Sequence, residues 1–398
     1  MISRLPQPTA FPPPPEGRSG WPWTTTEVAT TDAGTLWPRI TIVTPSFNQG
    51  AFIEETIRSI LLQGYPNLEY IIIDGGSTDC TMEVVGKYSA WITHAVSEPD
   101  RGQSHAINKG LILATGEWFN WINSDDFLAP GALFALAEAA IAIPGRVVVS
   151  GVTANLREDT VFSRYAAHVA PVWPDALFSL RVNQPGSLLH LPSVQAAGGV
   201  AEDLRLVMDL DLWLRLLRMH GPEALGAIDN EVATYRYHHD SKTCSADDVF
   251  ALEEFGVLID LAASVEGLEV PHSLASLRAR SPAARRRFVG SLPVNTAAAE
   301  RAWLRRLVVD DSLLFRAVRQ TASEKTDAFS TFEQLLNEIT PALRRHYPRG
   351  QTSRILAQAC LCAMQLHGQV IPLTALRVFS AVPSWTSAKA LARLLLRR

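Results

Sequence analysis

Aspartates that could hold a cation or move a proton recur at three places in the sequence: Asp74, the adjacent pair Asp125 and Asp126, and Asp209. Hard divalent cations such as Mg²⁺ and Mn²⁺ prefer oxygen ligands, often one or two carboxylates together with phosphate oxygens and water. The adjacent pair follows the apolar run at 118–122. It could therefore hold a divalent cation against a diphosphate.

Asp74 is followed by two glycines, Gly75 and Gly76, which allow a ligand to approach the backbone closely. A carboxylate at this position could accept a hydrogen bond from the imide of a pyrimidine base. Taken alone, such an aspartate is more typical of a tight turn, and two adjacent aspartates are more typical of a helix cap. The elements that position these residues must therefore decide between the alternatives.

Asp209 begins an amphipathic segment that predicts a helix over 209–219. The helix dipole stabilises an ionised carboxylate at this end, so Asp209 could act as a general base towards a hydroxyl group. Asp211 lies about 200° further round such a helix and cannot point the same way; we expect a structural pairing or an acceptor contact. The basic and hydroxyl residues at 235–243 suit a diphosphate, and a histidine there could reach the cation, unless the segment is an ordinary polar loop.

The apolar runs alternate between strand-like and helix-like patterns from residue 39 onward. They predict strands over 40–44, 69–74, 90–96 and 116–122, and helices over 52–63, 77–88, 106–115 and 128–143. Strands that alternate with helices form a mostly parallel sheet, in which ligands bind beyond the carboxyl ends of the strands. The polar clusters at 44–48, 74–79 and 123–126 all fall at such ends, so we expect one site.

The ends of the chain differ from this middle part. Residues 1–38 are rich in proline and predict an extended arm, which Trp21, Trp23 and Trp37 could pin onto the body. Residues 245–398 predict a helical region, with helices over 246–263, 297–322, 327–347, 353–366 and 385–398. After Glu338 there is no acidic residue but nine basic ones. This basic tail could bind an anionic membrane surface, or it could be a solvated helix face.

Composition excludes several classes of protein. The chain has 398 residues, 47% of them hydrophobic and 19% charged, which is typical of a globular protein with more than one compact part. The net charge of -4 argues against a nucleic-acid partner. Four cysteines without metal-binding spacing and an N-terminus without an apolar run predict a cytoplasmic protein, at most peripheral at the inner face of the membrane.

These motifs resemble those of the family 2 glycosyltransferases with the GT-A fold, in the bacterial branch that makes surface polysaccharides. The resemblance covers about residues 39–244 and rests on ordered blocks at 42–50, 73–79, 97–110, 114–117, 123–126, 209–215 and 236–243. It implies a Rossmann-like α/β domain, with a nucleotide-binding half over 39–127 and an acceptor half over 128–244. Asn123, Met208 and Ile107 stand where the family pattern has aspartate, glutamate and arginine.

The resemblance also implies roles for individual residues, with Asp209 as the catalytic base. The predicted metal ligands are Asp125, Asp126 and His238, for Mn²⁺ or Mg²⁺. The predicted acceptor side is formed by Gln184, Asp211 and Trp213. The predicted donor site comprises Thr44, Pro45, Ser46, Asn48, Asp74, Gly76, Gln103, Asn108, Asn123, Ser124 and Asp125.

The predicted function is inverting transfer of a sugar from a nucleotide sugar, a UDP-sugar by preference, to a hydroxyl of a saccharide or lipid-linked saccharide. A nucleotidyltransferase is an alternative, but it normally holds its triphosphate with a glycine-rich basic loop, and residues 45–49 contain no lysine or arginine. An inactive nucleotide-sugar-binding module is a second alternative. The presence of Asp209 together with Asp125 and Asp126 argues against it.

Overall fold

We describe a computed structural model of the chain, in which two compact units are distinguished. The described residues are 11–25, 36–239, 241, 247–279, 288, 290–308, 313–321, 325–348, 350–352, 355–356 and 359. The first unit, here the sheet unit, spans 1–171 and 180–245. The second, here the helical unit, spans 172–179 and 246–398. The sequence predicts one boundary at residue 244. In the structure residues 172–179, which precede this boundary, also belong to the helical unit.

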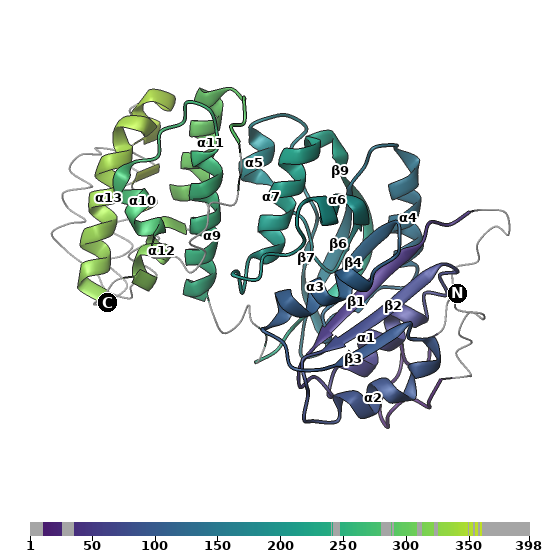
Figure 1. Ribbon diagram of the computed structural model, residues 1–398. Helices are drawn as coiled ribbons and strands as arrows, with labels where there is room; N and C mark the ends of the chain where they lie inside the picture. The colour runs from purple at the N-terminus through teal and green to yellow at the C-terminus, as the bar shows by residue number, and fades with distance from the viewer. Residues whose placement is uncertain are drawn as a thin grey trace. The chain divides into compact units, whose positions relative to one another are not determined.

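Four parallel strands form the first half of the sheet unit, as the alternating pattern predicts. Their order in the sheet is β3-β2-β1-β4, and helices connect successive strands (Figure 1). The register sets Ser46 level with Asp74 and Asp74 level with Ser97, so these polar residues share one edge of the sheet. The elements are β1 (Ile40–Ser46), α1 (Ile53–Leu61), β2 (Leu68–Asp74), α2 (Thr81–Lys87), β3 (His94–Ser97), α3 (Gln103–Leu113) and β4 (Trp118–Trp121).

The second half of the sheet is mixed. It continues as β8-β6-β9-β5, with β7 paired to β6; the β4–β8, β8–β6, β6–β7 and β9–β5 pairs are antiparallel, and β6–β9 is parallel. The long strand β9 therefore returns to the segment that follows β4. The elements are β5 (Phe127–Leu128), α4 (Ala132–Ala142), β6 (Val148–Arg157), β7 (Thr160–Tyr165), β8 (Ser187–His190), α6 (Leu191–Ala196), α7 (Met208–His220) and β9 (Leu225–Tyr237).

The two faces of the sheet carry different helices. On one face, Ile40 and Ile42 of β1 join one hydrophobic core with residues of α1 and α4. On the other face, Val43 packs so closely on α3 that a Cβ at Gly110 would lie 2.5 Å from its Cγ1. Side chains alternate between the faces along a strand, so each face of the sheet can support a different part of the site.

The N-terminal arm is held by a buried cation. Arg58 of α1 is 2% exposed, and its guanidinium donates hydrogen bonds to the carbonyls of Pro12, Pro22 and Trp23. The rings of Phe11 and Trp23 lie over it at 5.5 and 5.2 Å. The indole of Trp21 donates to the Leu128 carbonyl. The expectation that Trp21 and Trp23 pin the arm is confirmed, and Trp37 likewise packs edge-on against two core aromatic rings.

A buried carboxylate joins three strands at the edge of the sheet away from the polar clusters. Glu69 of β2 accepts hydrogen bonds from Thr41 of β1, from Thr115 just before β4, and from Arg39. Burial by itself would raise the pKa of Glu69, but these hydrogen bonds and the charge of Arg39 outweigh it and hold the pKa below its usual range. The strands are thereby held in register at this end.

The helical unit contains α5 (Asp175–Ser179), α9 (Asp247–Ala263), α10 (His272–Arg278), α11 (Thr296–Val308), α12 (Leu313–Thr321) and α13 (Lys325–His346). The segment predicted as one helix over 297–322 contains two described helices, α11 and α12, and residues 309–312 between them lie outside the described residues. Within the described residues, none of the helices is both long and apolar enough to cross a membrane. The basic tail and the helix predicted over 385–398 lie outside the described residues.

Two further boundaries differ from the sequence prediction for tertiary reasons. The predicted strand over 90–96 is a 3₁₀ turn at Ser89–Trp91 followed by β3, because only His94–Ser97 pairs with β2. The helix predicted from residue 128 begins at Ala132, because Phe127 and Leu128 pair with β9. This second difference concerns the site, since it brings β9 next to Asp125 and Asp126.

Candidate active site

The turn after β2 is organised by Asp74. Its carboxylate, which is fully buried, accepts hydrogen bonds from the backbone amides of Gly76 and Ser77 and from the hydroxyls of Ser77 and Ser97. Three of these donors bond Oδ2 and one bonds Oδ1, so most of the hydrogen-bonding capacity of the carboxylate is used within the protein. The structure thus gives Asp74 the turn-holding role that is the more typical one for an aspartate at such a position, and it holds the 75–77 turn against β3. Contact with a pyrimidine base stays a prediction.

The loop after β1 is tied to this turn. The backbone amide of Asn48, a residue in the left-handed region at φ 53°, donates to the Ser77 hydroxyl, and its side-chain oxygen accepts from the Thr78 amide. The amides of Gln49 and Gly50 donate to Thr81 and Asp79. The predicted donor residues Thr44, Pro45 and Ser46 precede this loop in β1, where all three are buried. The loops after β1 and β2 therefore form one rigid edge.

Asp125 lies opposite His238, a residue 113 positions further along the chain. The Asp125 Oδ2 and His238 Nε2 atoms are 2.9 Å apart, and the two side chains are 21% and 15% exposed. The imidazole also lies against the ring of Phe52, with a centroid separation of 4.7 Å. The sequence predicted that Asp125 and His238 act together, and the structure places them together. We call them the Asp–His pair.

Asp126 is held inside the protein behind this pair. It is 1% exposed, and its two carboxylate oxygens accept hydrogen bonds from the Arg236 backbone amide and the Asn123 side chain. Burial, and then the neighbouring charge of Asp125, raise the pKa of Asp126 well above its usual range, against the opposing effect of these hydrogen bonds. In the structure Asp126 holds the segment, and Asp125 and His238 are the partly exposed side chains in front of it.

Two predicted donor residues extend this network. The Gln103 side chain, in the first turn of α3, donates a 2.6 Å hydrogen bond to the Asn123 side-chain oxygen. Asn123 in turn donates to Asp126. The carbonyls of Ser124 and Asp126 both accept from the hydroxyl of Thr56 in α1. The segment after β4 is thereby fixed between α1 and α3, one on each face of the sheet.

An ion pair that the sequence did not indicate supports the Asp–His pair. Arg236 of β9 and Glu55 of α1 are nearly buried and lie 2.9 Å apart (Nη2–Oε2). The Nε atom of Arg236 donates to the Asp125 carbonyl, and its guanidinium lies between the rings of Phe52 and Phe127. The only sequence signal was a glutamate in the first turn of a helix with an arginine in a strand, which is too common to assign a role.

Helix α7 lies on the α3 face of the sheet. Its Trp213 stacks on Trp121, the last residue of β4, with centroids 6.1 Å apart and planes 12° apart. Trp121 is level with Val43, which faces α3. Asp209 lies one turn before Trp213 on the same side of the helix, so the catalytic candidate is on the side of α7 that meets the end of β4. Its carboxylate accepts from the Leu210 amide, and the residue is partly exposed.

The start of α7 is fixed by a second set of contacts. Asp211, which is fully buried, binds Arg215, and that guanidinium also donates to the Ala197 and Gly199 carbonyls. The structural pairing expected for Asp211 is confirmed. Gln184 donates to the Trp121 carbonyl. Gln184, Asp211 and Trp213, the residues predicted to form the acceptor side, are all buried in this structure, and direct contact between them and an acceptor stays a prediction.

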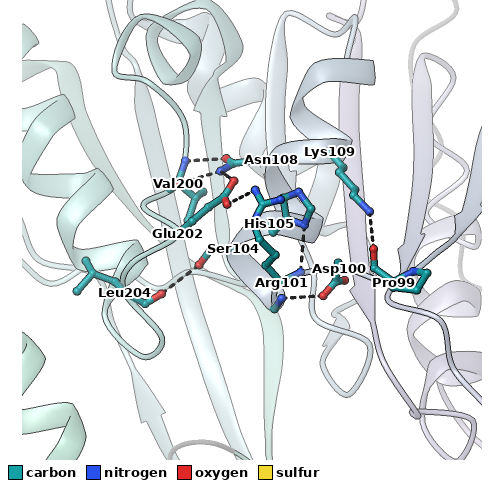
Figure 2. Close-up of polar contacts among 11 residues, drawn as sticks. Pro99, Asp100, Arg101, Ser104, His105, Asn108, Lys109, Val200, Glu202 and Leu204 are labelled. Carbon is teal, nitrogen blue, oxygen red and sulfur yellow. Dashed lines mark hydrogen bonds and ion pairs between the residues drawn. The ribbon is translucent and has the colours of Figure 1, made fainter. Parts of the chain in front are cut away.

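Asn108 holds the segment that leads to α7. Its side chain bonds the amide and the carbonyl of Val200 and also donates to Glu202, while Arg101 forms an ion pair with the same Glu202 (Figure 2). Figure 2 shows these side chains of α3 reaching across to residues 200–204, where the Ser104 hydroxyl meets the Leu204 carbonyl. The predicted donor contact of Asn108 stays a prediction. The structure shows a link between α3 and the segment that leads into α7, the helix on which Asp209 lies.

A divalent cation fits the donors of the Asp–His pair. A carboxylate oxygen and an imidazole nitrogen of two partly exposed side chains lie 2.9 Å apart, and both are ligand types that divalent cations accept. Mn²⁺ and Mg²⁺ use few protein ligands and complete their shells with water and substrate phosphates. In the described part of the chain, no group of three or more histidine, cysteine, aspartate or glutamate side chains is arranged as a metal site. Phosphate oxygens would therefore have to supply further ligands.

Breaking the Glu55–Arg236 ion pair should loosen the Asp–His pair. Glu55→Gln leaves the buried Arg236 without its counter-charge, so we expect the free energy of unfolding to fall by about 3 kcal/mol. We also expect Mn²⁺-dependent binding of UDP, measured by calorimetry, to weaken about 10- to 100-fold, as for groups that orient metal ligands. Glu83→Gln, at an exposed glutamate of α2, is the matched control. Unchanged UDP affinity in Glu55→Gln would show that Arg236 does not position Asp125.

The comparisons with known proteins agree with this fold. Residues 41–201 match the model described as glycosyl transferase family 2. The solved structure of S. aureus TarS 1-349, in complex with UDP-GlcNAc, superimposes with a TM-score of 0.53 at 14% identity, over 83% of this chain and 88% of that one. The fold is that of the GT-A glycosyltransferases, and the protein is a glycosyltransferase. The chain contains a glycosyl transferase family 2 domain, as its motifs indicated.

Curated relatives carry the same class of name. An uncharacterized glycosyltransferase of Rickettsia typhi is 27% identical over 237 residues, which is 56% of this chain and 71% of the relative. A putative teichuronic acid biosynthesis glycosyltransferase of Bacillus subtilis, TuaG, is 28% identical over 190 residues, which is 46% of this chain and 74% of the relative. Both relatives therefore match only about half of this chain.

Proposed function

We propose that the protein transfers a sugar from a nucleoside diphosphate sugar, a UDP-sugar by preference, to a hydroxyl group of a saccharide or lipid-linked saccharide in polysaccharide biosynthesis. The observation that supports this most directly is the position of the Asp–His pair, whose Asp125 lies in the segment that follows β4. Helix α7, on which Asp209 lies, packs through Trp213 on Trp121, the last residue of the same strand. One strand end thus has a candidate cation-binding pair on one side and a candidate base on the other.

The nucleoside side of the proposal rests on the edge formed by the loops after β1 and β2. Phe47 in this edge is 59% exposed, and a Cβ at Gly75 would lie 3.3 Å from its ring. An exposed aromatic ring beside a glycine is suited to stack on a base. Phe47 was not among the predicted site residues, although an aromatic residue within a polar loop was a signal for it. Asp74 contributes here by holding the turn that faces this ring.

In the proposed reaction, the acceptor hydroxyl attacks the anomeric carbon as its proton passes to the Asp209 carboxylate. The new oxygen–carbon bond forms as the bond from that carbon to the diphosphate breaks, and the nucleoside diphosphate leaves. Attack from the side opposite the leaving group inverts the anomeric configuration. Asp125 and His238 would hold a divalent cation, which when bound neutralises the charge that develops on the diphosphate. Asp126, Asn123 and Gln103 keep Asp125 in place.

The nucleotidyltransferase alternative is disfavoured by the same loops. Such an enzyme presents free backbone amides to a triphosphate. The amides of Asn48, Gln49 and Gly50 are already bonded to Ser77, Thr81 and Asp79. A triphosphate would have to displace all three hydrogen bonds. Binding of the chain to an anionic membrane through the basic tail stays a prediction.

Release of nucleoside diphosphate tests the proposal without knowledge of the acceptor. The full chain is incubated with a panel of UDP-, GDP- and dTDP-sugars and either Mn²⁺ or EDTA, and the released nucleoside diphosphate is measured. We expect slow release from one or a few UDP-sugars with Mn²⁺ and none with EDTA. Release of inorganic pyrophosphate from nucleoside triphosphates would favour the nucleotidyltransferase. Thermal stabilisation by a nucleotide sugar without any turnover would favour a binding module.

A further inference from the structure

An aromatic surface lies beside the Asp–His pair on strands β6, β7 and β9. The rings of Phe162 and Tyr237 meet edge to face with centroids 5.1 Å apart, as do those of Tyr235 and Tyr237 at 5.0 Å. The guanidinium of Arg157 lies over the rings of Phe162 and Tyr237, 5.1 and 5.6 Å from their centroids. We call these four residues the aromatic surface. Tyr237 is the residue immediately before His238.

Part of this surface is open to solvent. Phe162 is 50% exposed and its neighbour Tyr165 is 38% exposed, and all six residues of β7 are exposed. Among the described strands, β7 pairs with β6 and with no other, so it is an edge strand. Exposed aromatic rings on an edge strand favour aggregation unless they serve to bind something.

The alternation of side chains along β9 shows which face the surface occupies. Arg236 points to α1, where it meets Glu55 and Phe52. Its neighbours Tyr235 and Tyr237 therefore point to the opposite face, which is the face that carries α3 and α7. Asp209 is on α7. The aromatic surface and the candidate base thus belong to one face of the sheet, and the Glu55–Arg236 ion pair belongs to the other.

We propose that the aromatic surface binds the acceptor saccharide, with the C–H face of a pyranose ring on Phe162 and Tyr237 and its hydroxyls or carboxylate on Arg157. This inference rests on the proposed function. An acceptor must reach Asp209, and this surface lies on the face of the sheet that carries Asp209. Aromatic rings offer a negative face that attracts polarised C–H groups, and a guanidinium provides several donors at a fixed angle to them.

Other ligands fit the surface less well. A nucleotide base would also stack, but Phe47 offers a ring for it on the parallel half of the sheet, several strands away. A peptide strand added to β7 would use its backbone groups and would not require the ordered stack of Arg157 on two rings. A saccharide uses the rings and the guanidinium together.

Saturation-transfer NMR of the full chain with methyl glycosides tests the inference. The probes are the methyl glycosides of glucose, galactose, mannose and N-acetylglucosamine, with both anomers of each. We expect ring-proton signals from at least one probe, lost in Phe162→Ala and Arg157→Ala and kept in Phe162→Tyr. Val161→Ala is the matched control, because Val161 is the preceding residue of β7, is 39% exposed and faces the other way. Phe162 is exposed, so its replacement should not disturb folding.

Turnover gives a second measurement. With the donor found in the release assay, we expect Phe162→Ala to raise the KM for the bound methyl glycoside about tenfold, as for loss of one stacking contact. The inference would be overturned if saccharide signals survive in Phe162→Ala. It would also be overturned if none of the probes gives a signal with the unsubstituted chain. The NMR measurement needs no turnover, so it decides saccharide binding at this surface independently of the release assay. A chain that releases nothing from any nucleotide sugar would contradict the proposed function only.

Discussion

Replacing Asp209 with asparagine is expected to lower the rate of transfer about 10³-fold while leaving donor binding intact. The asparagine keeps the shape of the side chain and the hydrogen bond from the Leu210 amide, but it cannot accept the proton of the acceptor hydroxyl. General bases contribute about 10²- to 10⁴-fold to rates of this kind. The measurement is kcat for transfer to an acceptor, together with the affinity for UDP in the presence of Mn²⁺.

Asp229→Asn, at an exposed carboxylate of β9, provides the control for a lost negative charge on the same unit. A fall in UDP affinity equal to the fall in kcat would show that Asp209 acts on the donor and not on the acceptor. Transfer at the original rate in Asp209→Asn would remove this residue as the base. Another carboxylate on the α3 face would then have to be sought.

Loss of either member of the Asp–His pair is expected to abolish Mn²⁺-dependent binding of UDP. Asp125→Ala and His238→Ala each remove one of the two protein donors that face each other at 2.9 Å. A cation that already takes most of its ligands from water and phosphate keeps too few contacts with the protein after such a change. We expect the affinity for UDP with Mn²⁺ to fall about 10³-fold, to the level seen with EDTA. Calorimetry with and without the cation measures this directly.

His239→Ala is the matched control for His238→Ala, since it removes an adjacent imidazole that is exposed. We expect His239→Ala to keep the Mn²⁺-dependent affinity for UDP and His238→Ala to lose most of it. Equal UDP affinity with and without Mn²⁺ in the unsubstituted chain would mean that the pair serves a structural role only. The prediction that Glu55→Gln weakens UDP binding would then lose its basis as well, because Asp125, the residue that Arg236 positions, would not hold a cation.

The sequence was informative where the signal is local. A β-branched strand, a glycine-rich turn and an amphipathic helix are each decided by neighbours along the chain, so the parallel half of the sheet and the start of α7 were predicted within a few residues. The exceptions were β3, whose pairing partner decides its length, and α4, whose start depends on the pairing of Phe127 and Leu128 with β9. Pairing with a distant strand leaves no pattern in the local sequence.

The same distinction separates the predicted site from the structural one. Residue types and the motif resemblance were enough to propose roles for Asp125, His238 and Asp209, because few side chains can hold a cation or accept a proton; these roles stay predictions. The sequence alone could not show that the Asp74 carboxylate bonds its own turn and Ser97 of β3, that Asp126 is buried behind Asp125, or that Glu55 supports Arg236. Those facts depend on burial and on contacts between segments up to 181 positions apart, and such contacts exist only once the chain has folded.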